Sequence, residues 1–79
     1  MPYISVKTFP KDKETKEELA EQLLETIQKT WNVKPEWVTI AIEDVAPEVW
    51  DEQVTKAEIQ PKMDSVLILD GKKLFKGEK

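Results

Sequence analysis

Along the first half of this chain, apolar residues recur first with a period of two residues, then with a period of 3.6, and then again with a period of two. Between Pro2 and Phe9, isoleucine and valine alternate with serine and lysine, which predicts a strand that Pro10 ends. From about Glu14 to Trp31 the apolar residues recur at helical spacing, which predicts an amphipathic helix. That helix is expected to bury a single stripe, formed by Leu19, Ala20, Leu23, Leu24, Ile27 and Trp31.

A second strand is predicted at Val38–Glu43, where β-branched residues again alternate and supply a face toward the helix. The sequence also marks the ends of the helix between the strands: Asp12 or Thr15 is expected to cap its start, and Asn32 is expected to stop it before Pro35. Strand, helix and strand in this length form one crossover unit. If the strands are parallel neighbours, the connection between them is right-handed. The fold class expected is α+β, built on a β-α-β subunit.

The second half of the chain is predicted to add helical segments. Pro47 suits a first helical position, so a helix is expected to run from there to about Gln53. A further helical piece is expected at Lys56–Met63, with a break near Gln60 because Pro61 is awkward inside a helix.

The C-terminal tail is strongly apolar at Ser65–Leu69, turns at Asp70-Gly71, and is expected to return as a short strand within Lys72–Phe75. The 79 residues are expected to form a single domain, residues 1–79, whose small size makes it marginally stable. Two strands and one helix cannot close a core alone. We therefore expect a homo-oligomer, and first of all a dimer with a four-stranded sheet and helices on one face.

The composition excludes several kinds of chemistry. There is no cysteine or histidine, so disulfides, zinc sites of the usual ligands and Ser-His or Cys-His nucleophiles are excluded. All twelve basic residues are scattered lysines in a chain of net charge −4, which argues against nucleic-acid binding. No apolar run is long enough for a membrane span. We expect a soluble cytoplasmic protein without metal or cofactor, whose acid–base groups are carboxylates, lysines, Tyr3 and its own amino terminus.

The order and spacing of several motifs resemble the tautomerase superfamily, in particular its short 4-oxalocrotonate tautomerase-like members. The likeness is carried by Met1-Pro2 with the strand that follows, by the helix ending at Trp31, and by the second strand. The stretch Pro47–Trp50, with Ala57–Met63 after it, is similar to a slightly longer, typically dimeric bacterial branch. The resemblance implies a cofactor-free keto–enol tautomerase with an N-terminal proline as its catalytic base.

Pro2 becomes a free secondary amine when Met1 is removed, and no side chain offers that group. An α-amino group titrates near ~8, well below lysine at ~10.4. Desolvation or a nearby cation lowers such a pKa further, toward the range that best suits proton transfer at neutral pH. The alternative interpretation is that Met1-Pro2 is an ordinary start leading into an edge strand.

The resemblance also implies residues that contact the substrate. Trp50 matches the position of an aromatic wall beside the proline, although it also suits the core face of a helix. Family members use arginines to hold the substrate carboxylate; here those neighbourhoods offer Lys11 or Lys13, and Thr39. Lysine attracts a carboxylate as a point charge but lacks the arginine fork. The lysines can equally be solvated loop charges.

The expected substrate is therefore a small unsaturated 2-oxo acid or its enol, with one carboxylate and an apolar tail. The missing arginines favour an alternative from another class, which is a non-catalytic dimeric binding or scaffold module that retains the fold.

Overall fold

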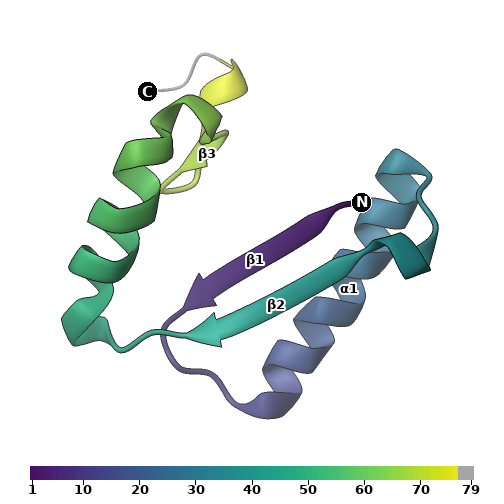
Figure 1. Cartoon of the computed structure of the whole chain (residues 1–79), viewed down its shortest axis with the longest axis horizontal. Helices are drawn as coiled ribbons and strands as arrows, with labels where there is room; N and C mark the ends of the chain where they lie inside the picture. The colour runs from purple at the N-terminus through teal and green to yellow at the C-terminus, as the bar shows by residue number, and fades with distance from the viewer. Residues whose placement is uncertain (77–79) are drawn as a thin grey trace. The chain divides into compact units, whose positions relative to one another are not determined.

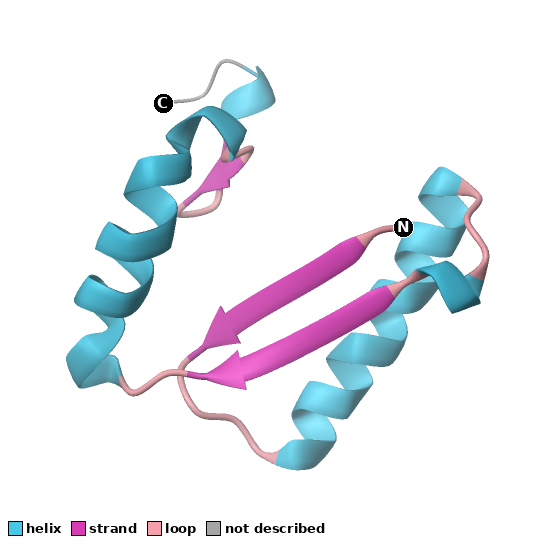
Figure 2. Ribbon diagram, in the orientation of Figure 1, coloured by secondary structure: helices cyan, strands magenta, loops and turns pink. Residues whose placement is uncertain are grey.

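A computed structural model describes residues 1–76 of the chain, which divide into two compact units. The first is Met1–Pro47, and the second begins at Glu48. Helices and strands are mixed in both units, so the predicted α+β class is confirmed (Figure 2).

The first unit is a parallel strand pair with a helix between the strands in sequence. β1 (Tyr3–Thr8) lies beside β2 (Thr39–Asp44), and α1 (Lys13–Trp31) connects them by way of a short 3₁₀ turn, η1 (Pro35–Trp37) (Figure 1). The register pairs Ile4 with Ile40 and Val6 with Ile42. Both strands therefore direct their β-branched residues to the same face. The predicted strand–helix–strand order is confirmed, and each end of each strand differs from its predicted position by one residue.

Side chains and backbone groups of the flanking residues close both ends of α1. Asp12 precedes the helix, and its Oδ1 accepts a hydrogen bond from the Thr15 backbone N–H at 3.2 Å. Asp12 is thus the cap, in preference to Thr15. Asn32 follows the helix in the left-handed conformation, with φ 54°, and its N–H bonds to the Gln28 carbonyl at 2.9 Å. Asparagine tolerates that conformation better than most residues, so the predicted stop is confirmed.

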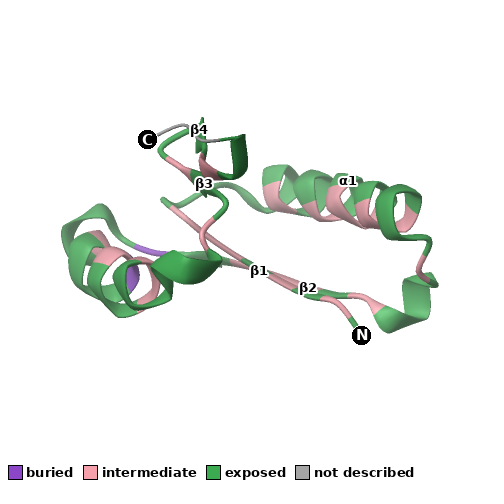
Figure 3. Ribbon diagram, turned by 90° about the horizontal axis from the view of Figure 1, so that it is seen from above, coloured by how far each residue is buried: buried purple, intermediate pink, exposed green. Residues whose placement is uncertain are grey.

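Very little of the chain is buried. Among the described residues, two apolar side chains count as buried, Val45 at 8% exposure and Val54 at 6%. In the first unit, the strands and one face of α1 are half-buried (Figure 3). Several large apolar side chains of the same unit are exposed to solvent, including Trp31 at 64% exposure. In this unit a helix packs on two strands, but almost no hydrophobic core lies between them.

The second unit opens with a run of helix whose type differs from the prediction. After a 3₁₀ turn, η2 (Pro47–Val49), the chain forms a π-helix, η3 (Asp51–Ile59), and then a 3₁₀ segment, η4 (Gln60–Ser65). The predicted separate pieces ending at Gln53 and beginning at Lys56 are wrong, because η3 runs through both positions. The break expected near Gln60 is confirmed: the π-helix ends there, and the backbone of Lys62 leaves helical geometry.

The tail forms a tight hairpin of two-residue strands. β3 (Ile68–Leu69) pairs antiparallel with β4 (Lys72–Lys73), and Leu69 faces Lys72 across the turn. Asp70 and Gly71 both have positive φ, 49° and 82°, as a two-residue type I′ hairpin requires. The expected strand within Lys72–Phe75 is shorter than predicted, because the next residues form a 3₁₀ turn, η5 (Leu74–Lys76).

Candidate active site

Pro2 is held at the beginning of β1 by the other strand. Its carbonyl accepts a hydrogen bond from the Thr39 backbone N–H at 3.1 Å, and Tyr3 is the register partner of Thr39. Pro2 is half-buried, whereas Met1 is 93% exposed. The structure therefore brings together two of the residues proposed from sequence, Pro2 and Thr39, at one end of the strand pair.

An apolar groove lies on the first unit near this end. It has a volume of about 250 Å³ and runs between β1 and the second half of α1. The groove is lined by Ile4, Leu23, Thr26, Ile27, Thr30 and Trp31. Because side chains alternate along a strand, Pro2 belongs to the same face as Ile4. The apolar surroundings that a neutral amine requires are thus available on the Pro2 side of the sheet.

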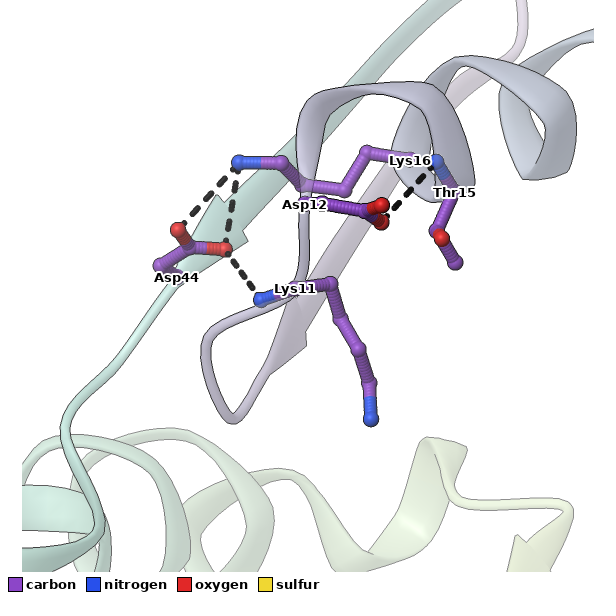
Figure 4. Close-up of polar contacts among 5 residues, drawn as sticks. All are labelled: Lys11, Asp12, Thr15, Lys16 and Asp44. Carbon is purple, nitrogen blue, oxygen red and sulfur yellow. Dashed lines mark hydrogen bonds and ion pairs between the residues drawn. The ribbon is translucent and has the colours of Figure 1, made fainter.

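Lys11 and Lys13 lie beyond the opposite end of β1. A strand of six residues spans about 20 Å, so neither lysine shares a site with Pro2 of the same chain. Lys13 is the first residue of α1, and its ammonium lies 3.9 Å from Glu17 in an exposed pair. The backbone N–H of Lys11 points to Asp44 Oδ1 at 3.5 Å, while its side chain extends away from that carboxylate (Figure 4).

At this far end the Lys16 ammonium, one turn into α1, is held by an ion pair. Its ammonium contacts both carboxylate oxygens of Asp44, each at 3.2 Å, and ties the end of β2 to the start of the helix (Figure 4). Lys16 and Asp44 are partly shielded, with side-chain exposures of 27% and 39%. This pair stabilises the crossover unit and leaves Lys16 committed to a structural contact.

Sequence reasoning missed Lys34, a cation at the Pro2 end of the sheet. It precedes η1, which leads directly into β2, and its ammonium lies 5.5 Å from the centre of the Trp37 ring. A cation over an aromatic face is attracted by the ring quadrupole. In the sequence, Lys34-Pro35 indicates only the end of a helix. The three-residue separation of Lys34 and Trp37 does not by itself predict that the two side chains are in contact.

Trp50 belongs to the second unit, where it immediately precedes η3 and is half-buried. Its backbone is already helical, with φ −57° and ψ −47°. The interpretation of Trp50 as an aromatic wall stays a prediction, as do the substrate roles of Lys11, Lys13 and Thr39.

Comparison with known proteins decides the family. Residues 2–56 match the sequence model of the family described as Tautomerase enzyme. The chain belongs to the tautomerase family. It is 38% identical over 69 residues to Tautomerase PptA of Enterobacter sp. (strain 638), covering 85% of this chain and 91% of that protein. It is 37% identical over 68 residues to Tautomerase PptA of Cronobacter sakazakii (strain ATCC BAA-894), covering 84% and 90%.

Membership of the tautomerase family supports an isomerase function of the tautomerase type for this chain. The match begins at Pro2 and includes Trp50, Lys11, Lys13 and Thr39. Within residues 1–76, no three acidic side chains come together in a way that would hold a metal ion. None of the helices in these residues is long and apolar enough to cross a membrane.

Proposed function

We propose that this chain is a cofactor-free keto–enol tautomerase of a small unsaturated 2-oxo acid, with the Pro2 amine as general base and acid. The reaction moves one proton within the substrate. The neutral amine takes a proton from the carbon beside the carbonyl, and the electron pair of that bond moves into the conjugated system. The resulting ammonium returns the proton at another position, so the enzyme and the atom count are unchanged.

The observation that carries this proposal is the hydrogen bond between the Pro2 carbonyl and the Thr39 N–H. It fixes the proline without using its nitrogen. Because Met1 is 93% exposed, its removal frees the nitrogen and takes away little packing. The proline ring then starts a strand whose next inward residue, Ile4, lines an apolar groove. An amine in such surroundings loses hydration, which favours its neutral form.

We further propose that the working unit is a dimer and that the substrate carboxylate is bound by a lysine. Lys11 or Lys13 would have to come from a second copy, since each lies about one strand length from Pro2 of its own chain. Trp31 and the groove beside it offer the exposed apolar surface that a second copy would cover. Trp50 is proposed as the apolar wall that keeps water from the amine.

The test is ketonisation of phenylenolpyruvate, followed by ultraviolet absorbance, on protein whose intact mass shows that Met1 is absent. We expect turnover that Pro2→Ala abolishes or greatly reduces. Protein that retains Met1 is the matched control, because its Pro2 nitrogen lies in a peptide bond. Equal rates for the wild type and Pro2→Ala would overturn the assignment of Pro2.

The absence of arginine favours a second candidate, a dimeric binding module that keeps the fold without the reaction. Arginine is the residue best suited to bidentate binding of a carboxylate. A protein of this kind would bind small 2-oxo acids with unchanged affinity in the presence or absence of Met1, and would not turn them over. Calorimetric titration of the two forms, alongside the rate measurement, separates the candidates.

A further inference from the structure

Lys34 is tied to the Pro2 end of the strand pair by a short, hydrogen-bonded stretch of backbone. The Trp37 N–H bonds to the Lys34 carbonyl at 3.0 Å, which closes the turn η1, and two residues later the Thr39 N–H bonds to the Pro2 carbonyl at 3.1 Å. A turn keeps its first and fourth Cα atoms within about 7 Å, and two extended residues add about 7 Å. Lys34 therefore lies one turn and two extended residues from the residue that holds Pro2. Figure 1 shows η1 and the N-terminus at the same end of β1 and β2.

Tyr3, Trp37 and Thr39 share one face of the strand pair, called here the open face, while α1 lies on the other side (Figure 3). Ile4 lines the groove beside α1, and side chains alternate along a strand, so Tyr3 and its register partner Thr39 project to the opposite face. Val38 has an extended backbone, with φ −102° and ψ 130°, which directs Trp37 to the same side as Thr39. All three residues of the open face are exposed. This end of the face thus presents two hydroxyl groups beside an indole ring.

The Trp37 ring holds the ammonium of Lys34 at this face. The ammonium lies 5.5 Å from the centre of the ring, within the range in which an aromatic face attracts a cation. Among residues 1–76 no ion pair joins it to a carboxylate, not even to that of Glu36 in the same turn. Lys29, in the last turn of α1, is instead paired with Glu25 at 3.9 Å. Lys34 therefore combines an orienting contact with a charge that no carboxylate of these residues neutralises.

Resting on the function proposed above, we propose that Lys34 binds the substrate carboxylate from the same chain as Pro2 and so selects anionic substrates. The Pro2 nitrogen is a backbone atom just before β1, so a substrate that reaches it can extend along the open face. An ammonium attracts a carboxylate as a point charge, and the Thr39 hydroxyl of this face can donate a hydrogen bond to it. Because Trp37 already orients the lysine, less side-chain freedom is lost on binding. A carboxylate has two oxygens, so a lysine of a second copy can bind the same group.

Ligand binding tests this inference without turnover. The probe is 3-phenylpropanoate, which has a carboxylate and an aromatic tail but no 2-oxo group, and 3-phenylpropan-1-ol is its uncharged counterpart. In NMR titrations of the whole chain without Met1, the acid should shift the Trp37 indole signal, and the alcohol should bind more weakly. Lys34→Ala should raise the Kd of the acid about fivefold, and Lys34→Arg, which keeps the charge, should stay near the wild-type value.

Lys29→Ala is the matched control, because it removes one positive charge from an exposed lysine near the end of α1. It should leave the Kd of the acid unchanged. An unchanged Kd in Lys34→Ala overturns the inference. Equal affinity for the acid and the alcohol, or no binding of the acid by the wild type, overturns it as well.

Salt distinguishes an electrostatic role of Lys34 from a packing role. Salt screens the attraction between exposed charges, with a Debye length of about 30 Å at 0.01 M and about 3 Å at 1 M. The fivefold difference in Kd between the wild type and Lys34→Ala should therefore shrink as sodium chloride is raised over this range. A difference that does not change with salt would show a packing role and overturn the inference.

Steady-state kinetics on phenylenolpyruvate give a second readout. Lys34→Ala should raise KM about fivefold and leave kcat nearly unchanged, because the carboxylate is charged in both the substrate and the transition state. A fall in kcat with unchanged KM overturns the inference.

The outcomes also separate this inference from the proposed function. Binding that depends on Lys34, without turnover that depends on Pro2, keeps the carboxylate site and rejects the tautomerase reaction. Turnover that depends on Pro2, with Kd and KM insensitive to Lys34, does the opposite.

Discussion

The Thr39 backbone N–H donates to the Pro2 carbonyl at 3.1 Å, so the first residue of one strand holds the residue that precedes the other. This bond extends the parallel ladder by one step beyond the Tyr3–Thr39 pair. It orients the proline through its carbonyl and does not involve the nitrogen.

Thr39→Pro should lower kcat/KM while leaving the fold in place. Proline removes the donor but is tolerated at the first residue of a strand, and Val38 already has the extended backbone that must precede it, with φ −102° and ψ 130°. Loss of the bond should cost about 1 kcal/mol of unfolding free energy. Denaturant unfolding and steady-state kinetics measure the two effects. Thr39→Val keeps the donor and removes the hydroxyl, so it should raise KM with unchanged stability. Full activity of Thr39→Pro would contradict the positioning role.

Mixing two inactive variants should partly restore activity if the site is shared between copies. Pro2→Ala lacks the amine and Lys11→Ala lacks the proposed carboxylate ligand, but a mixed dimer contains one site with both groups. Mixing Lys11→Ala with a variant that carries both substitutions is the comparison, because no dimer in that mixture contains Lys11. We expect recovery in the first mixture and none in the second. Recovery in neither mixture would contradict a partner lysine at position 11.

Asp44→Ala should destabilise the first unit by about 1–2 kcal/mol, because it leaves the shielded Lys16 ammonium without its carboxylate. Glu17→Gln is the control, since its pair with Lys13 is exposed and 3.9 Å long. That control should change stability by a few tenths of a kcal/mol at most. Urea unfolding at low and high salt measures both variants. If the two substitutions lowered the free energy of unfolding equally, the Lys16–Asp44 pair would contribute no more to stability than an exposed ion pair.

Asp12 should make stability depend on pH in the acid range. The Thr15 hydroxyl and backbone N–H stabilise its charged form and hold the pKa of this carboxyl below its ordinary value of 3.8. The cap therefore contributes fully above pH 3.8 and is lost as the pH falls through the lower, folded pKa. Thermal unfolding from pH 5 downward should show a smaller acid-induced loss for Asp12→Asn than for the wild type. Parallel pH curves would contradict this assignment.

Local patterns predicted the first unit well because each of its elements has a simple period. Ile4 and Val6 alternate, the helix stripe repeats at 3.6, and Asn32 stops the helix by its tolerance of positive φ. The second unit was predicted less well. A gap was expected between Gln53 and Lys56, and the π-helix that runs through it is too rare a helix type to be expected from sequence.

The candidate site was predicted only in part for a different reason. Pro2 and Thr39 meet because strand pairing is local to the crossover unit, and a parallel pair was among the expectations. Lys11 and Lys13 were chosen by family likeness, which does not say which copy of the chain supplies them. Lys34 was overlooked because its significance depends on where β2 begins beside β1, a tertiary relationship that the sequence does not display.

The parallel register of β1 and β2 has a consequence for how proteins of this kind can vary in length. The hydrogen bond to Thr39 fixes the position of Pro2. That position does not depend on the number of residues between Pro2 and Thr39. Insertions at Pro10 or near Lys34 would lengthen the connection and leave the amine where it is. One residue inserted inside β2 would shift the pairing and turn every later side chain to the other face. Evolution can therefore lengthen the crossover freely, while the strand itself tolerates no change in length.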